Sequence, residues 1–206
     1  MLIPLVRLEV WSDVVCPWCY IGKRRMERAL DAWDGEPVEV LWRPFQLDPD
    51  APSDGTPMPE ALAAKFGGPD VAREAMAQVT SVAAEEGLAY RLGDALRANT
   101  FDAHRLIAFA ADQGVQDAVQ ERFFRAHFTE GAHLGDPEVL AKLAADAGLT
   151  GADDALRDDA LAERVRAELA EGVAIGVRSV PTFVVGNRGV SGAQDPSAIL
   201  DLLRSA

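Results

Sequence analysis

Residue types that cross-link small domains or bind metal ions are scarce in this sequence. Two of its 206 residues are cysteine and three are histidine. A bond between Cys16 and Cys19 would close too short a loop to stabilise a fold, so we expect no disulfide scaffold. A zinc site needs a full tetrahedral set, and no second Cys-x-x-Cys pair joins the scattered His104, His127 and His133. We therefore expect no metal site and no bound cofactor.

Long apolar runs and basic charge are also lacking. No apolar stretch approaches the roughly 20 residues of a membrane-spanning helix, so we expect no membrane partner. The net charge of −13 repels phosphate backbones, so we expect no nucleic-acid partner. Residues 1–9 hold no basic segment followed by a long apolar stretch, so we expect no signal peptide and a cytoplasmic location. The oligomeric state stays open.

The apolar residues that are present suffice for one substantial core, and their spacing predicts an ordered succession of elements. Alternation over 6–11, with Val10 on one face and Trp11 on the other, predicts a strand. Helical spacing predicts a helix from Pro17 to about 32, and 38–42 predicts a second strand. The chain therefore begins β-α-β.

The middle of the chain follows a different pattern. Four prolines within 48–59 predict a loop that leaves the sheet. Beyond it, apolar residues recur at helical spacing, which predicts an all-helical region over about 60–175. An aromatic stripe of Phe123, Phe124 and Phe128 within that region is typical of a core.

The end of the chain returns to strand patterns. Residues 182–185 and 190–192 predict two short strands joined by a tight turn, and a last helix is expected from about 195. The expected fold class is α/β, in the order β-α-β, helices, β-β-α with a mixed sheet. We expect one domain from 1–58 with 176–206, and an inserted helical domain at 59–175.

The motif Cys16-Pro17-Trp18-Cys19 follows the first strand and opens the first helix. Unpaired N–H groups and the dipole at a helix N-terminus favour a negative charge on the Cys16 sulfur, so we expect Cys16 to be the attacking thiolate. Cys19 lies one turn deeper and suits the resolving role, which breaks a mixed disulfide. Pro17 fits the first turn, and Trp18 offers an apolar face beside the sulfur. This combination predicts a catalytic dithiol, against the alternative of two buried structural cysteines.

Two segments resemble a known family. Cys16-Pro17-Trp18-Cys19-Tyr20 early in the chain and 176–183, which contains Val180-Pro181-Thr182, are similar to the DsbA-like branch of the thioredoxin fold. The resemblance spans nearly the whole chain. Further segments are similar to the FrnE-like subgroup: 11–23, 43–47, Asn99-Thr100 with 103–106, and 191–194.

The resemblance implies a thioredoxin fold with a large helical insertion and several roles for residues. It implies a cis peptide before Pro181, which places the Val180 backbone beside Cys16 to hold a substrate chain as an added strand. It also suggests that Asn99, His104 and Arg105 border the groove of the active site. A packed or exposed histidine without function is the plainer alternative for His104.

One departure from the wider family concerns proton transfer. Thioredoxin relatives often place a buried acid six positions before the first cysteine, and here that residue is Val10. Asp13 is the acidic residue nearest in sequence, but a capping or surface role suits it equally well. Proton transfer to Cys19 is left unassigned at this point.

Three functions are compatible with these patterns. The first is a thiol–disulfide oxidoreductase whose substrate is a protein or small molecule that carries a thiol or disulfide, with glutathione as a possible co-substrate. The second is a glutathione-dependent isomerase or transferase of the hydroxychromene carboxylate isomerase or kappa-class type, although those relatives commonly have serine in place of Cys16. The third is a chaperone-like module that binds peptides without catalysis. Retention of both cysteines favours the first, because an adjacent pair can resolve its own mixed disulfide.

Overall fold

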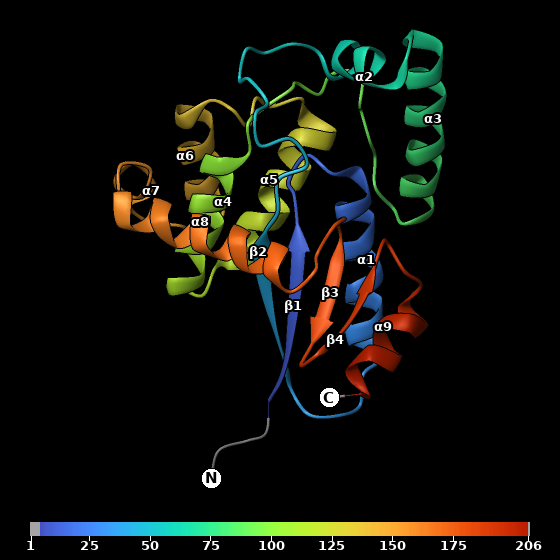
Figure 1. Ribbon diagram of the computed structural model, residues 1–206, viewed down its shortest axis with the longest axis vertical. Helices are drawn as coiled ribbons and strands as arrows, with labels where there is room; N and C mark the ends of the chain where they lie inside the picture. The colour runs from blue at the N-terminus through green and yellow to red at the C-terminus, as the bar shows by residue number, and fades with distance from the viewer. Residues whose placement is uncertain (1–4, 206) are drawn as a thin grey trace.

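The computed structural model describes residues 5–205, and in them a mixed four-stranded sheet lies between layers of helices (Figure 1). The strand order is β2-β1-β3-β4; β1 and β2 are parallel, and the other neighbours are antiparallel. The strands are β1 Val6–Ser12, β2 Val38–Pro44, β3 Thr182–Val185 and β4 Arg188–Ser191. The expected β-α-β and β-β-α order with a mixed sheet is confirmed. Residues 1–4 lie outside the described residues. They belong to the segment 1–9, in which no signal peptide was expected.

Helices make up most of the remaining structure. Their bounds are α1 Pro17–Asp31, α2 Met58–Phe66, α3 Pro69–Glu85, α4 Phe101–Asp112, α5 Gln116–Glu130, α6 Pro137–Asp146, α7 Ala152–Ala155, α8 Asp159–Ala174 and α9 Pro196–Leu203. Helices α2 to α8 separate β2 from β3, as expected of the insertion. The expected helical region is interrupted, however: after α3 the chain is irregular until Thr100, and Leu96 forms a single β-bridge to Pro57.

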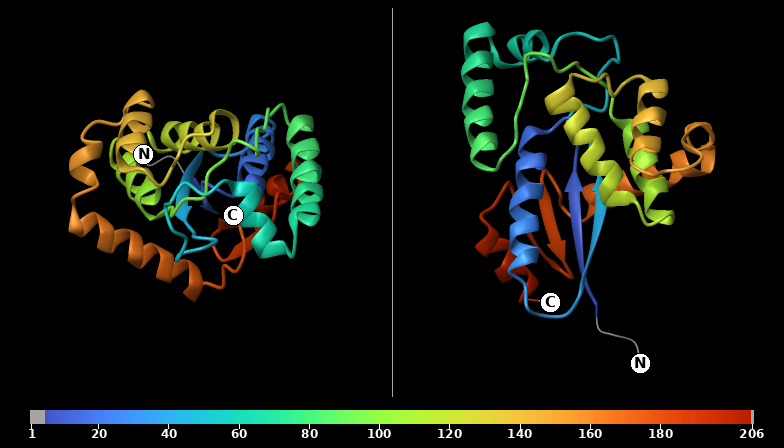
Figure 2. Two further views of the ribbon diagram at one scale, coloured as in Figure 1. Left: turned by 90° about the horizontal axis from the view of Figure 1, so that it is seen from above. Right: turned by 180° about the vertical axis from the view of Figure 1, so that it is seen from behind.

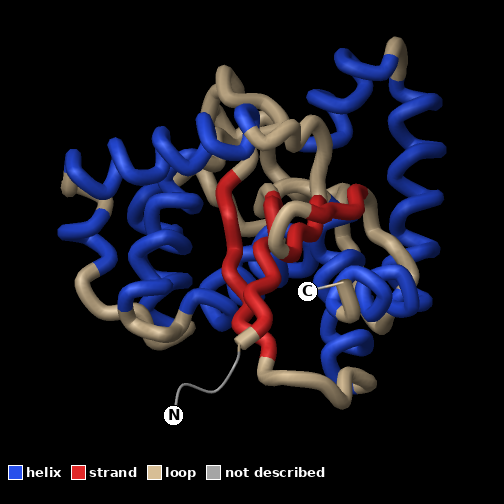
Figure 3. Tube along the Cα trace, turned by 60° about the horizontal axis from the view of Figure 1, so that its bottom comes forward, coloured by secondary structure: helices blue, strands red, loops and turns tan. Residues whose placement is uncertain are grey.

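Helices cover both faces of the sheet (Figures 2 and 3). On one face, Trp42 of β2 meets Phe124 of α5 edge to face, with ring centroids 6.3 Å apart. On the other face, α8 crosses the sheet and packs against Trp11, which is fully buried. A Cβ at Gly172 of α8 would lie 2.5 Å from the Trp11 ring, so glycine permits this close approach. Strand β1 is therefore buried on both faces near its end, because the insertion shares one core with the sheet.

Several local expectations are refined by the structure. Phe123, Phe124 and Phe128 are core residues, as expected. The hairpin turn is shorter than expected, because β4 begins at Arg188. Asn99 accepts the N–H of Phe101 at 3.0 Å at the start of α4. Asn99, the residue before the N-cap Thr100, thus binds the first backbone N–H of α4.

Helices α2 and α3 form a hairpin above the N-terminal end of α1 (Figure 1). None of the residues Met58–Phe66 is buried, and α3 buries only a few small and branched side chains. The hairpin is held at its ends: the Met58 N–H donates to the Ala95 carbonyl at 2.8 Å, and Glu86 pairs with Arg25 of α1 at 2.7 Å. The hairpin thus covers the end of α1 that carries the cysteine motif. In residues 5–205, no helix has both the length and the apolar character to cross a bilayer.

Candidate redox site

The cysteine motif begins α1 at the carboxyl end of β1. Cys16 is the N-cap residue, with extended backbone (φ −89°, ψ 112°), and Pro17 occupies the first helical position. The Cys16 N–H donates to the Asp13 carbonyl and the Cys19 N–H to the Cys16 carbonyl, both at 3.0 Å. The first turn of α1 carries no acidic side chain that would oppose a negative sulfur. Cys16 thus lies after β1 at the N-terminus of α1, as the sequence predicted.

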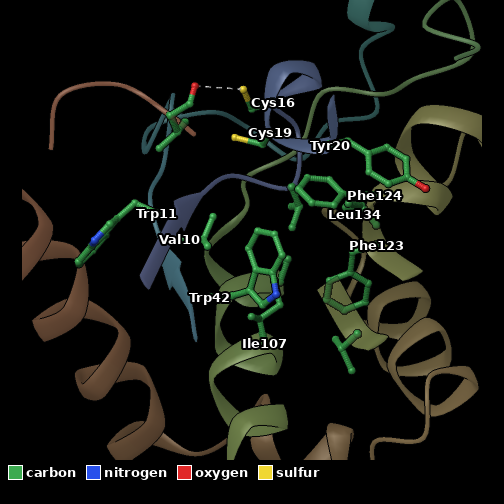
Figure 4. Close-up of a cluster of buried hydrophobic side chains, with 14 of the residues drawn as sticks. Val10, Trp11, Cys16, Cys19, Tyr20, Trp42, Ile107, Phe123, Phe124 and Leu134 are labelled. Carbon is green, nitrogen blue, oxygen red and sulfur yellow. Dashed lines mark hydrogen bonds between the residues drawn. The ribbon is translucent and has the colours of Figure 1, made fainter. Parts of the chain in front are cut away.

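Both cysteines are free thiols, and both are buried. Cys16 is 3 % exposed and Cys19 1 %. The Cys16 thiol lies 3.7 Å from the Val180 carbonyl oxygen, toward which the dashed line in Figure 4 points. The peptide bond between Val180 and Pro181 is cis. The structure therefore brings the early and late segments of the sequence together at the Cys16 sulfur.

Glycine at position 22 makes that meeting possible. Gly22 lies in the middle of α1, and a Cβ there would lie 2.8 Å from Pro181 Cγ. Helix interiors disfavour glycine by roughly 1 kcal/mol relative to alanine. Here the missing side chain lets the Pro181 segment lie directly on the helix beside the cysteines.

The environment of Cys19 keeps it protonated. Burial raises the pKa of the Cys19 thiol well above its usual range, and the neighbouring Cys16 raises it further through a hydrogen bond and its charge. The backbone N–H of Asp13 and the hydroxyl of Ser12 act in the opposite direction, because they can donate to the Cys19 sulfur. Cys19 is therefore a buried thiol with donors already placed for its thiolate.

Asp13 is buried beneath the motif, and its side chain does not cap α1. It is 1 % exposed, and its Oδ2 accepts the Leu47 N–H at 2.8 Å. Its Oδ1 lies 3.4 Å from His104 Nε2, which is also 2.9 Å from the Phe45 carbonyl oxygen. The backbone of Asp13 thus contacts the cysteine motif, and its carboxylate contacts Leu47 and His104.

His127 of α5 is the second histidine near the motif, and no role was predicted for it. It is buried, and its ring meets Phe128 edge to face at 4.7 Å. Burial lowers the pKa of His127 to about 4, although the charge of Asp13 acts in the opposite direction. His127 is therefore neutral at neutral pH.

A cleft of about 870 Å³ opens over Cys16. Its walls come from the start of α1, the α2–α3 hairpin, the segments around 47–51 and 92–98, and the end of α5. The lining is mostly apolar and includes Trp18, Leu47, Met58, Phe66 and Met76. Among the charged lining residues, Arg97 pairs with Asp48 at 2.9 Å. An apolar ligand can therefore approach the Cys16 sulfur from this side.

The predicted site residues divide into two groups. Pro17, Trp18 and Val180 line the cleft with Cys16, and Trp18 is 38 % exposed. Asn99, His104 and Arg105 are not among its lining residues. Their side chains form hydrogen bonds with the surrounding structure instead.

The contacts of this second group explain its position. Asn99 donates through Nδ2 to the Pro49 and Ala51 carbonyls, which shapes the loop at the rim. Arg105 bonds Asp102 and the Asp158 carbonyl at 3.0 Å. His104 faces inward, toward Asp13.

Tyr90 is a neighbour of the motif that sequence reasoning missed. Its hydroxyl donates to the Pro17 carbonyl at 2.6 Å, and its ring stacks on Phe128 at 4.8 Å. Burial raises the pKa of Tyr90, so the hydroxyl remains a donor. It lies in the irregular segment before α4, where neither periodicity nor a motif marked it. Its contact with the motif joins residues far apart in the sequence, so only the folded structure shows it.

Comparison with known proteins identifies the family. The family model described as DSBA-like thioredoxin domain matches residues 7–204. The chain belongs to this family. The protein YwbO of Bacillus subtilis is 30 % identical over 198 residues, which cover 91 % of this chain and 90 % of YwbO.

Solved structures extend the comparison. The crystal structure of the probable DsbA oxidoreductase SCO1869 from Streptomyces coelicolor has a TM-score of 0.89 and 40 % identity, over 97 % of this chain and 89 % of that one. The cytosolic disulfide reductase DsbM from Pseudomonas aeruginosa has a TM-score of 0.66 and 20 % identity, over 97 % of both chains. A 2-hydroxychromene-2-carboxylate isomerase has a TM-score of 0.64 and 15 % identity, over 97 % of this chain and 93 % of that one.

The family and the SCO1869 structure give the general activity. They support an oxidoreductase or isomerase role on substrates that carry thiols or disulfides. The two more distant structures share the fold, the DsbA-like thioredoxin fold with a helical insertion. Within residues 5–205, no group of three or more His, Cys, Asp or Glu side chains is arranged to hold a metal ion.

Proposed function

We propose that this protein is a thiol–disulfide oxidoreductase in which Cys16 is the nucleophile and Cys19 resolves the mixed disulfide. The observation that carries the proposal is the pairing of two free thiols at the start of α1, where Cys16 is among the residues that line the cleft. A structural pair would have no need of a cleft over one of its sulfurs. The alternation of dithiol and disulfide needs no cofactor other than the protein's own sulfurs.

The geometry supports a part in the proposed reaction for each of these residues. The free N–H groups at the start of α1 favour the Cys16 thiolate, which attacks one sulfur of a substrate disulfide. The substrate chain pairs with the Val180 backbone, whose carbonyl oxygen now accepts the Cys16 thiol. Cys19 then attacks the Cys16 sulfur and releases the substrate as a thiol. Pro17 and Trp18 form the rim over which the substrate enters.

The apolar lining of the cleft favours substrates that carry apolar groups beside their own thiol or disulfide. Met58 and Met76 line it, and methionine side chains adapt to ligands of different shape. A protein segment and a small molecule both fit a volume of this size, since small-molecule sites span roughly 300–1,000 Å³. We further propose membership of the FrnE-like subgroup and a cytoplasmic location, which two free cysteines suit.

A glutathione-dependent isomerase or transferase is the second candidate. The shared fold with the hydroxychromene carboxylate isomerase supports it. Against it stands the second thiol, for which an isomerase without a dithiol cycle has no use. A chaperone-like module is the third candidate, and its peptide binding would survive the loss of both thiols.

Covalent trapping tests the proposal. Incubation of the C19S variant with a cysteine-containing disulfide peptide should leave one peptide attached to Cys16, read by mass. Wild type should pass through this state and end as an intramolecular disulfide, and the C16S variant should form no adduct. If C16S retains glutathione-dependent turnover, the isomerase or transferase assignment takes the place of the oxidoreductase. Suppression of aggregation by the C16S/C19S double variant, with no disulfide turnover in wild type, would support the chaperone.

A further inference from the structure

A hydrogen bond from outside α1 reaches the backbone of the cysteine motif. The Tyr90 hydroxyl donates to the Pro17 carbonyl oxygen at 2.6 Å, across 73 positions of sequence. In a helix, that carbonyl already accepts the backbone N–H four residues on, so α1 does not require a second donor. A carbonyl oxygen has two lone pairs and can accept both hydrogens. The bond from Tyr90 is therefore an addition to the motif that the helix alone does not explain.

The surroundings of Tyr90 hold its hydroxyl at this position. Tyr90 is 8 % exposed, and its ring stacks on Phe128 of α5 with ring centroids 4.8 Å apart. The N–H of the next residue, Arg91, donates to the Phe128 carbonyl at 2.7 Å. Both the ring and the backbone beside it are thus fixed on α5, so the hydroxyl is oriented before a substrate arrives.

The ionisable groups around Tyr90 keep its hydroxyl protonated. Burial raises the pKa of Tyr90, and charge on Cys16 raises it further. Charge on Tyr20 and Cys19 acts in the same direction, and the charge of Arg24 acts in the opposite one. Electrostatic interaction is mutual, so a hydroxyl that responds to charge on a sulfur also acts on that charge. Tyr90 is therefore a neutral donor close to both sulfurs.

A peptide group connects the bond from Tyr90 to the first cysteine. Cys16 is the N-cap residue of α1, so Pro17 and Trp18 are the first and second helical residues. The Pro17 carbonyl and the Trp18 N–H belong to the same planar peptide group. A donor to the oxygen polarises this group and strengthens its N–H as a donor by about 10–30 %. The side chain of an N-cap residue accepts from the second or third N–H of its helix, and the second is that of Trp18.

Ionisation changes the hydrogen bonds that the Cys16 sulfur can form. As a thiol, Cys16 donates to the Val180 carbonyl at 3.7 Å and accepts no bond from the helix. A thiolate has no hydrogen to donate, and it is stabilised by the free N–H groups of a helix N-terminus. A stronger Trp18 N–H therefore favours the thiolate over the thiol.

We propose that Tyr90 is a positioning residue that stabilises the Cys16 thiolate through the peptide group between Pro17 and Trp18. The inference rests on the dithiol cycle proposed above. The thiolate exists only in the reduced protein, so a group that stabilises it also favours the reduced form over the disulfide. Tyr90 therefore increases the fraction of nucleophilic Cys16 near neutral pH and makes the disulfide a stronger oxidant.

Y20F is the matched control for loss of the Tyr90 hydroxyl. Tyr20 and Tyr90 are the two tyrosines of the chain, and their rings are stacked with centroids 6.2 Å apart. The Tyr20 hydroxyl donates to Glu121 at 2.7 Å and points away from both sulfurs (Figure 4). Y20F and Y90F thus each remove one hydroxyl from the same stack, but only Y90F removes the bond to the motif.

The pH profile of Cys16 alkylation in the full reduced chain tests the inference. Cys19 is buried and stays protonated, so iodoacetamide reacts at Cys16, and mass measurement gives the rate. In Y90F the midpoint should move to higher pH, and the rate below it should fall about twofold to threefold, as loss of one polarising bond predicts. Y20F should keep the wild-type midpoint. Reduction of the Y90F disulfide by glutathione should become less favourable by the same factor, which is about 14 mV for a threefold change.

3-Fluorotyrosine provides a measurement that does not depend on the folding of Y90F. In Y20F, Tyr90 is the one remaining tyrosine, so growth on 3-fluorotyrosine labels that position alone. Fluorine makes the phenol more acidic and its hydroxyl a stronger donor, and it leaves the ring in place. The labelled protein should therefore show its midpoint at lower pH than unlabelled Y20F.

The inference and the dithiol cycle fail in different ways. An equal midpoint in Y90F and wild type, or an equal shift in Y90F and Y20F, would overturn the role of Tyr90 and leave a hydroxyl that only anchors its segment. A midpoint that the fluorine does not move would do the same. Alkylation of Cys16 does not require the cycle, so a wild type that forms no Cys16–Cys19 disulfide in glutathione would instead overturn the cycle itself.

Discussion

The two sides of the cleft are built in opposite ways. The floor, which we define as the start of α1, the turn at Asp13 and the Val180–Pro181 segment, consists mostly of buried residues held by hydrogen bonds, with Trp18 exposed at its rim. The cover, the α2–α3 hairpin, buries no residue of Met58–Phe66 and is held at its ends. The contrast indicates that the floor fixes the sulfur chemistry, whereas the cover provides an adaptable apolar surface. Regions with few buried contacts open at low free-energy cost.

The largest effect should come from acid, through the buried His127 of α5. His127 titrates at about 4 when folded and near 6.5 when unfolded. The unfolded chain therefore binds more protons between these values, so stability is complete above about pH 6.5 and falls as pH decreases toward 4. The loss should reach roughly 3 kcal/mol, since one pKa unit corresponds to about 1.4 kcal/mol.

Urea unfolding of wild type and H127Q across this pH range isolates the contribution of His127, because the other titrating groups are shared. The difference between the two free energies of unfolding should change by that amount between pH 7 and pH 4. A difference independent of pH would mean that His127 is protonated as readily in the folded chain as in the unfolded one.

The next largest effect should come from a substitution at Gly22, where α1 lies directly against Pro181. G22A places a methyl group 2.8 Å from Pro181 Cγ, so either α1 or the Pro181 segment must shift. We expect the free energy of unfolding to fall by about 1–3 kcal/mol, the usual cost of overpacking. We also expect slower alkylation or slower mixed-disulfide formation at Cys16, because the segment beside its sulfur moves.

The matched variant is G93A, in the segment that links the cover to α4. A Cβ at Gly93 meets no atom within 4 Å, so the same chemical change should alter stability by less than about 0.5 kcal/mol. Thermal melts and reaction rates of both variants decide the comparison. Equal behaviour of G22A and G93A would show that Gly22 is not needed for close contact with Pro181.

A substitution in the cover should cause the smallest change in stability, but it should weaken substrate binding. Phe66 is 44 % exposed and lines the cleft. F66S should change the free energy of unfolding by less than about 0.5 kcal/mol. It should raise KM for an apolar disulfide peptide about fivefold, which corresponds to roughly 1 kcal/mol of lost contact.

V173S provides the control, since Val173 is also exposed and apolar but lies on α8 and outside the cleft lining. Its KM should equal that of wild type. If F66S and V173S have the same KM, the cover does not contact substrate, and the division between floor and cover fails.

The sequence predicted those elements whose pattern is local. Alternation and helical spacing located β1, α1, β2 and the closing β-β-α unit, and the Cys-x-x-Cys spacing located the candidate nucleophile. Trp11 was assigned to the face opposite Val10, and the structure places it there. Its complete burial depends on Gly172, 161 positions away in sequence. Local alternation does not contain that information.

The surroundings of the sulfurs were less predictable for the same reason. Asp13, His104 and His127 come from a turn and two helices, and only folding joins them. His104 carried a resemblance to a groove residue, yet it faces the buried carboxylate. Tyr90 lies in a segment with no periodicity, so its bond to the Pro17 carbonyl left no trace in the sequence. Motif spacing predicted the candidate reacting atoms, and tertiary contacts show which residues surround them.

A redox titration of the full chain against glutathione tests the central claim most directly. Alkylation of the remaining thiols followed by mass measurement counts the free cysteines at each potential. We expect wild type to pass reversibly from two free thiols to none without retained glutathione, and C19S to accumulate one glutathione on Cys16. A wild type that keeps both thiols across the titration, or that binds glutathione only non-covalently and equally well in C16S, would contradict a catalytic Cys16–Cys19 dithiol.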